Sequence, residues 1–425
     1  MFAEFPQCSI IDVIHFVERK TKFSKAFESI LPKSKKGEQD FILIMAAILS
    51  NAIRIGAGKM AEISDLKKSA LITAELAYVR TETLKEVIDI LNNAAAQLPI
   101  FKDWYINGIS HGSLDGVKLE VSLQNIMARH SKKHLGSDAC VSSYNSILNC
   151  FPIAGRLIGA NEYEGNYTFE MVQHQNIPEL SLENVSSDKH GTNSLNYGLF
   201  DLTHRLFAPR IPKPHRETLW GFGNLKDYEN YIVKPTKIIN ENFVTKQWDE
   251  VQRLVSSMIT GYASPNVTIG KLSSKNYTSK TKKAFVQYNH IVRSHFILMY
   301  IHDKEFRRAI MRALNRGEEY NNLYQAITIL KKGEFRGKNE IEMEIWNQCT
   351  RLISAIILYY NTYILNSLYV NSTDEKVKKY LLELSPAAWV HINMLGYYQF
   401  FGEKQDEYIE RWIKQWDWQK NVAFC

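Results

Sequence analysis

Hydrophobic positions along the chain follow a helical period at both ends and a period of two in between. Helical spacing marks the N-terminal segments IIDVIHFVERKTKF, DFILIMAAILSNAIRIG and LKEVIDILNNAAAQL. Residues 106–180 change to short β-rich runs punctuated by Gly and Asn, which predict a three-strand meander followed by a helix at NYTFEMVQHQ. Next come a short strand ending at Asp188, a polar loop, a helix and a proline-containing irregular stretch over 209–240. Long helical patterns return from Trp248, so the order of elements predicts an α+β fold.

Composition adds few constraints. The 425 residues are 45% hydrophobic, which is enough for two or three cores of about 150 residues each. The net charge of +7 is compatible with a polyanionic partner such as nucleic acid but does not require one. Five scattered cysteines without a CxxC pair predict neither a zinc knuckle nor a disulfide framework, and free thiols suit a reducing cytoplasm.

No membrane association is expected. The longest apolar run, residues 41–53, is too short to cross a bilayer and is typical of a buried helix. The N-terminus has no basic region ahead of its apolar residues, so it does not resemble a signal peptide.

Three acidic positions are candidates for chemistry. Asp115 precedes a period-two strand and is followed by Gly116, and Asp188 ends the later strand. A third acid lies in a predicted helix and is either Glu318 or Glu319, because spacing alone does not decide between them. Two strand acids and one helix acid match a two-metal phosphoryl-transfer site. The alternative for Asp115 is a turn acid that caps a strand.

Basic side chains gather in two places. The first is a lysine run interrupted by Tyr277, comprising Lys271, Lys275, Lys280, Lys282 and Lys283. The second is a stripe at helical spacing that leads to the helix acid, comprising Arg308, Arg312 and Arg316. Each has two interpretations: contact with phosphates, or a solvated surface. HExxH, GxxxxGK[ST] and GxSxG motifs do not occur, which argues against zinc proteases, P-loop ATPases and simple serine hydrolases.

Four motifs in a fixed order identify a family resemblance. The sequences SHGSLDGVKLEV, SSDKHGTNSLNYGLFDL, RRAIMRALNRGE and SPAAWVHINMLGYY resemble the C-terminal catalytic region of the replicative class II (Tn-three-type) transposon transposases of DDE type. The resemblance implies an α+β fold with a ribonuclease-H-like core interrupted by a helical insertion and flanked by helices. The boundaries would be an N-terminal helical segment at 1–105, core parts at 106–215 and 300–370, the insertion at 216–299 and a helical tail at 371–425.

The resemblance also implies a catalytic site. Asp115, Asp188 and Glu318 correspond to the DDE triad and would hold two Mg²⁺ ions, with Mn²⁺ able to substitute and Asp115 bridging both ions. The implied activity is metal-dependent nicking of transposon ends followed by strand transfer to target DNA. The implied partner is double-stranded DNA, contacted by the lysine run together with Arg312 and Arg316, with a homodimer left open. The implied location is the cytoplasm, associated with the nucleoid when bound to DNA.

Three departures from the family pattern keep a second function open. Family members are typically more than twice as long, with N-terminal domains that recognise transposon ends, so the chain is interpreted as a fragment, a split gene product or a remnant. Lys189 follows the second acid where a small polar residue is usual, and Val117 stands where Gln is frequent. The alternative is therefore a catalytically inactive remnant that binds DNA or an intact transposase. An extended strand would point Lys189 away from Asp188.

Overall fold

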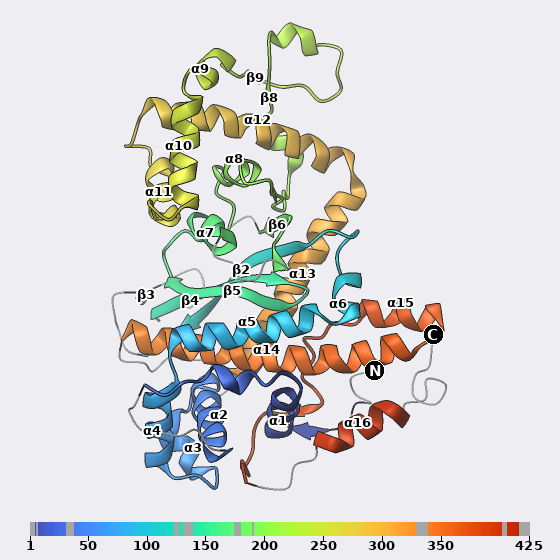
Figure 1. The fold of residues 1–425 in the computed structure, drawn as a ribbon. Helices are drawn as coiled ribbons and strands as arrows, with labels where there is room; N and C mark the ends of the chain where they lie inside the picture. The colour runs from blue at the N-terminus through green and yellow to red at the C-terminus, as the bar shows by residue number, and fades with distance from the viewer. Residues whose placement is uncertain are drawn as a thin grey trace. The chain divides into compact units, whose positions relative to one another are not determined.

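The chain folds into two compact units with mixed α and β structure (Figure 1), which confirms the predicted α+β class. The first unit comprises Met1–Gly108, Gly116–Asn161 and Glu318–Cys425, and the second comprises Ile109–Asp115 and Glu162–Gly317. The computed structural model describes Phe5 and residues 7–30, 38–122, 127–130, 139–173, 180–188, 191–328, 339–401 and 406–415.

Helices dominate the first unit. They are α1 (Ile10–Thr21), α2 (Glu38–Ala52), α3 (Gly56–Glu62), α4 (Lys68–Tyr78), α5 (Thr81–Ala96), α6 (Pro99–Asp103), the end of α13 (Lys304–Ile327), α14 (Glu340–Asn371), α15 (Glu375–Glu383) and α16 (Asp406–Gln415). The long α14 is buried over most of its length and packs beside α5 and α2 (Figure 1). It begins where the Asn339 side chain accepts a 2.9 Å hydrogen bond from the Glu342 N–H, which satisfies one of the free donors of its first turn.

The strands of the first unit form an antiparallel hairpin. β4 (Ala139–Leu148) pairs with β5 (Phe151–Gly159), while β3 (Arg129–His130) pairs with β4 on its other side, and β2 (His111–Glu120) is also a neighbour of β4. Helices α5 and α14 pack on β5. These strands confirm the predicted three-strand region. Two short strands, β1 (Cys8–Ser9) and β10 (Ile392–Asn393), pair in parallel elsewhere in this unit.

The turn between β4 and β5 has unusual chemistry. Its two residues, Asn149 and Cys150, have φ values of 50° and 71°. A two-residue hairpin of this kind favours Gly at the second position, and Cys150 occupies it instead. The Cys150 thiol donates a hydrogen bond to Glu319 Oε2 at 3.4 Å. This bond connects the strained turn residue to α13.

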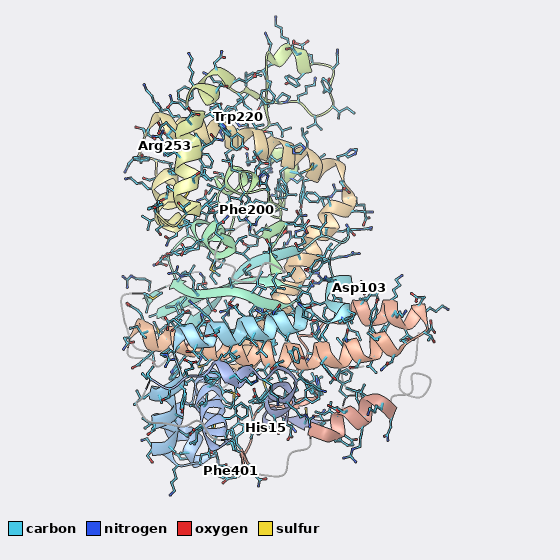
Figure 2. All side chains as sticks on the ribbon, viewed as in Figure 1. His15, Asp103, Phe200, Trp220, Arg253 and Phe401 are labelled. Carbon is cyan, nitrogen blue, oxygen red and sulfur yellow. The ribbon has the colours of Figure 1, made fainter. Side chains whose placement is uncertain are left out.

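Three parallel strands organise the second unit. Residues His111 to Leu114 of β2 pair with β6 (Asn184–Ser187), and β6 pairs with β7 (Leu206–Phe207). Around them lie α7 (Thr168–Gln173), α8 (Asn196–Asp201), α9 (Glu241–Lys246), α10 (Trp248–Ile259), α11 (Pro265–Ser273), α12 (Lys280–His302) and most of α13. Phe200, labelled in Figure 2, stacks on Phe207 at 5.4 Å and anchors α8 to β7.

The stretch predicted to be irregular contains only short elements. Residues 209–240 hold two 3₁₀ turns, Pro214–Arg216 and Leu225–Tyr228, and two strands of two residues each, β8 (Trp220–Gly221) and β9 (Lys237–Ile238). The prediction is confirmed in outline, and the structure adds that β8 and β9 pair in parallel and close a loop.

No single helix among the described ranges is long and apolar enough to cross a membrane. One pair, Asp40–Ala52 with Gly56–Glu62, passes by length and composition but is bent by 112°. The apolar side chains of α2 lie almost entirely in the core of the first unit, which confirms the prediction of a buried helix there.

Candidate active site

Asp115 lies on β2, and Asp188 directly follows the neighbouring strand β6. Leu114 of β2 is in register with Ser187 of β6, and each acid is the next residue of its chain segment. Parallel strands lie about 4.8 Å apart, and residues in register point to the same face. The strand register therefore predicts that the two carboxylates lie near each other in the second unit.

The loop after β6 holds Asp188 in place. Its Oδ1 accepts the backbone N–H of Gly191 at 2.9 Å, while the Thr192 hydroxyl donates to its carbonyl oxygen at 2.7 Å. These bonds form an Asx-type turn that orients the carboxylate. Tyr163 closes the same loop by donating to the Thr192 carbonyl at 2.5 Å. Burial and, second, the charge of Asp188 raise the pKa of Tyr163, so the hydroxyl keeps its proton. Lys189 lies outside the described residues, and its orientation stays a prediction.

Beneath the acids, a chain of hydrogen bonds ties the three parallel strands together. His111 Nε2 lies 2.8 Å from Ser186 Oγ, and the Ser186 hydroxyl donates to the Ala208 carbonyl at 2.8 Å. Because Ser186 gives its only proton to Ala208, His111 must donate from Nε2. Burial, reinforced by the positive charge of Arg316, lowers the pKa of His111 to about 4. The ring is therefore neutral at pH 7 and acts as a fixed donor.

Helix α13 packs against the same polar strand face at a glycine. A Cβ added at Gly317 would lie 2.5 Å from Ser113 Oγ, well inside van der Waals contact. Ser113 is buried, and its hydroxyl has no hydrogen-bond partner among the described residues. His111, Ser113 and Asp115 alternate along β2 and so share one face. Gly317 lets α13 approach that face closely, and Glu318 is the next residue of the helix.

The structure distinguishes the two adjacent glutamates. Glu319 accepts a hydrogen bond from the buried Cys150 thiol and is half-buried, whereas Glu318 is exposed. Both belong to the first unit. A side chain engaged with a structural turn is a poor candidate for a ligand, which favours Glu318 as the helix acid.

Sequence comparison places this geometry in a known group. A sequence model described as the Tn3 transposase DDE domain matches residues 12–398, about nine-tenths of the chain. The chain belongs to this family. It is 28% identical over 417 residues to the transposase for transposon Tn1546 of Enterococcus faecium, a match that covers 95% of this chain and 41% of the relative.

Further relatives agree with this assignment. The transposase for transposon Tn501 of Pseudomonas aeruginosa is 26% identical over 92% of this chain, and the transposase for transposon gamma-delta of Escherichia coli is 22% identical over 93%. Each match covers 40% of the relative, so this chain of the DDE family spans about two-fifths of the length of the curated relatives it matches.

Membership in the DDE family implies a divalent metal cofactor. The side chains at hand are hard oxygen donors, which suit such an ion. The predicted ligands Asp115, on β2, and Asp188, directly after β6, belong to the second unit, and Glu318 belongs to the first unit. Over the described ranges, no group of three or more His, Cys, Asp and Glu side chains is arranged as a metal site. The convergence of the three carboxylates stays a prediction.

The basic residues predicted to contact DNA fall into two classes in this DDE domain. Lys282 donates to the carbonyls of Ser274 and Tyr277 at 2.6 and 2.7 Å, and the Lys271 ammonium lies 5.1 Å from the Tyr277 ring, so both lysines brace their own loop. Lys271 is nevertheless exposed, as are three further lysines and one arginine of this set in the second unit: Lys275, Lys280, Lys283 and Arg312.

The other two arginines of the predicted stripe have partners. Arg316 is half-buried and its charge acts on His111. Arg308 forms an ion pair with Glu305 one turn earlier in α13. Arg312 is therefore the member of the stripe best placed for a partner outside the chain.

Sequence reasoning missed the residues that support the acids. His111, Ser113 and Ser186 were not singled out. A serine stands two positions before each aspartate, and residues two apart in a strand point to the same face. This spacing could have identified the residues beside the acids.

Proposed function

We propose that this chain is the catalytic region of a DNA transposase that nicks transposon ends and joins them to target DNA. Membership in the DDE family and similarity to proteins named as transposases support the activity. The structural observation that carries it is the parallel register of β2 with β6, which ends at the pair Leu114 and Ser187. Asp115 and Asp188, 73 positions apart in the sequence, are the next residues of the two segments, and the proposal is that their carboxylates act together.

We further propose that the catalytic core is ribonuclease-H-like. Support comes from an antiparallel hairpin, β4–β5, in one unit and from parallel pairing of β2, β6 and β7 in the other. The first acid lies on β2, the second directly after β6, and the third on α13. Helices α9 to α12 fill most of the stretch 216–299 and correspond to the proposed helical insertion.

Asp115, Asp188 and Glu318 would hold the metal ions, proposed to be two Mg²⁺. Such ions neutralise phosphate charge and lower the pKa of water, which is the chemistry that in-line phosphoryl transfer needs. The protein's own contribution is positioning. Gly191 fixes the Asp188 carboxylate, and Gly317 sets the closest approach of α13 to β2.

Double-stranded DNA is the proposed partner. Four exposed basic side chains of the second unit, Lys275, Lys280, Lys283 and Arg312, would contact phosphates, since such contacts supply most of non-specific affinity. The implied site of action is the bacterial cytoplasm, and a homodimer stays an open proposal.

The test measures Mg²⁺-dependent nicking of a duplex that carries a transposon end, with the N-terminal part of a full-length relative supplied separately. Asp115→Asn, Asp188→Asn and Glu318→Gln should each lower nicking at least 100-fold while leaving DNA affinity within about threefold. Glu319→Gln is the matched control, because glutamine still accepts from the Cys150 thiol, and it should retain activity.

Two results would contradict the proposal. Loss of nicking in Glu319→Gln with full activity in Glu318→Gln would move the third ligand by one residue. DNA binding by the wild-type chain without nicking under any of these conditions would favour the inactive remnant.

A further inference from the structure

The loop between β8 and β9, residues 222–236, carries an unusual concentration of exposed apolar side chains. Ile232 is 102% exposed and Tyr231 is 61% exposed, with Val233 next to them. Figure 1 shows the loop, in yellow-green, standing clear of α10 and α12 of the same unit. Three consecutive exposed apolar residues are a liability for solubility unless they have a function.

The loop is held firmly in shape. The Tyr228 hydroxyl accepts the Phe222 N–H and donates to the Phe222 carbonyl, both at 3.0 Å. Gly221 lets the chain close, since a Cβ there would lie 2.8 Å from Pro235. The Lys234 ammonium donates to the Glu229 carbonyl across the tip. A tip preorganised in this way loses little conformational entropy on binding.

The aromatic residue at the base of the loop is not available to a ligand. Trp220, labelled in Figure 2, stacks on His290 with ring centroids 4.0 Å apart and an interplanar angle of 7°. The Lys237 ammonium lies 5.1 Å from the centroid of the same indole. His290 anchors the loop base to α12 and Lys237 covers the indole from β9, so the apolar groups offered for contact are those at the tip.

Charge around the tip suits a polyanion. Residues 209–246 contain seven Lys and Arg against four Asp and Glu. Lys226, Lys234 and Lys237 flank the tip, while Asp227 is used inside the loop to accept the Asn224 N–H at 3.1 Å. A projecting aliphatic point flanked by lysines differs from the flat apolar core of a protein interface. It matches the apolar wedges that proteins push between base steps of the DNA minor groove.

We propose that Ile232, supported by Tyr231, inserts between two base pairs of duplex DNA while the flanking lysines contact the adjacent phosphates. The inference rests on the proposed DNA-binding function and adds a deformation of the bound duplex. Such insertion unstacks one step and bends the helix, at a cost of a few kcal/mol that is lowest at pyrimidine–purine steps.

The experiment uses the full chain and a 30-base-pair duplex with 2-aminopurine at one central TpA step. Unstacking raises 2-aminopurine fluorescence, and binding is followed separately by anisotropy of an end label. Wild-type protein should raise the fluorescence at saturation at least twofold. Ile232→Ala should remove most of that rise, and its salt dependence of binding should be unchanged because the substitution leaves every phosphate contact in place.

Ile259→Ala is the matched control, because Ile259 is also exposed in the second unit, at 46%, but lies on α10. It should behave as wild type. Lys226→Ala removes an exposed flanking lysine and should lower the magnitude of the salt slope by up to about 0.9 while the saturated fluorescence persists.

The outcomes separate this inference from the proposed function. DNA binding with no fluorescence rise in the wild type, or an unchanged rise in Ile232→Ala, would overturn the wedge and leave the transposase proposal intact. No DNA binding at all would overturn both. Sedimentation tests the alternative partner. If Ile232→Ala changes the protein from dimer to monomer but leaves DNA binding and the fluorescence rise unchanged, the tip docks on a second copy of the chain instead.

Discussion

Replacing Gly317 by alanine tests the close approach of α13 to β2. Alanine in a helix interior gains about 1 kcal/mol over glycine. Against this, the new Cβ would lie 2.5 Å from Ser113 Oγ, in a site where Ser113 is buried and cannot simply turn into solvent. Overpacking of this kind costs about 1–3 kcal/mol. The expected net change is a destabilisation of up to about 2 kcal/mol.

Removing the opposing hydroxyl should reverse the sign. In Ser113→Ala the nearest remaining atom to the new Cβ is the Cβ of residue 113, at 3.5 Å, an ordinary contact. Gly317→Ala in that background should therefore stabilise the protein by about 1 kcal/mol, the helix-propensity gain alone. The coupling energy of the double-mutant cycle should be about 1–3 kcal/mol.

The assay is urea unfolding of the four proteins, followed by circular dichroism and by tryptophan fluorescence so that departures from a single transition are visible. Nicking activity provides a second measurement, since a displaced helix also displaces the next residue, Glu318. If Gly317→Ala destabilises the wild-type protein and the Ser113→Ala variant equally, the steric explanation is wrong and the glycine has some other role.

Two further predictions follow from the described contacts. Lys280→Ala with Lys283→Ala should flatten the salt dependence of DNA binding by up to about 0.9 for each phosphate contact removed, and an unchanged slope would return the lysine run to a solvated surface. Lys282→Ala should instead raise the protease sensitivity of its loop, because its ammonium bonds two carbonyls there. The pKa of His111 is about 4 in the folded protein and 6.5 in the unfolded chain, so the unfolded state binds the proton first as the pH falls. The free energy of unfolding should therefore decrease between pH 6.5 and pH 4, by up to about 1.4 kcal/mol per pH unit. Stability measured in urea across that pH range should fall less steeply in His111→Gln, and an identical slope would show that this ring is not titrating as described.

The sequence was sufficient for elements with a strong local signal. The apolar period of α14 and the alternation of Val117 and Leu119 in β2 each predicted the observed element. Such patterns work because one buried face repeats at the period of the backbone. Family motifs then selected Asp115, Asp188 and Glu318 from the 45 acids of the chain, which spacing alone could not do.

What the sequence left out depends on contacts between distant segments. Nothing local marks His111 as a neutral donor, because its state follows from Ser186 in β6 and from Ala208 directly after β7. The same holds for the lysine run, where Lys282 and Lys283 look equivalent in sequence. Only the turn of α12 decides that Lys282 faces the preceding loop and Lys283 faces outward.

The β4–β5 turn has a consequence for the order in which the chain folds. A left-handed conformation at Cys150 costs about 1–2 kcal/mol that glycine would not incur, so the hairpin is penalised while it is alone. Its compensating thiol contact is to Glu319, 169 positions later in the sequence, and closing so long a segment is slow. The hairpin should therefore mature late, after α13 has docked, and Cys150→Gly should speed its formation. The stage at which the β4–β5 hairpin forms therefore depends on Glu319, the residue next to the proposed catalytic Glu318.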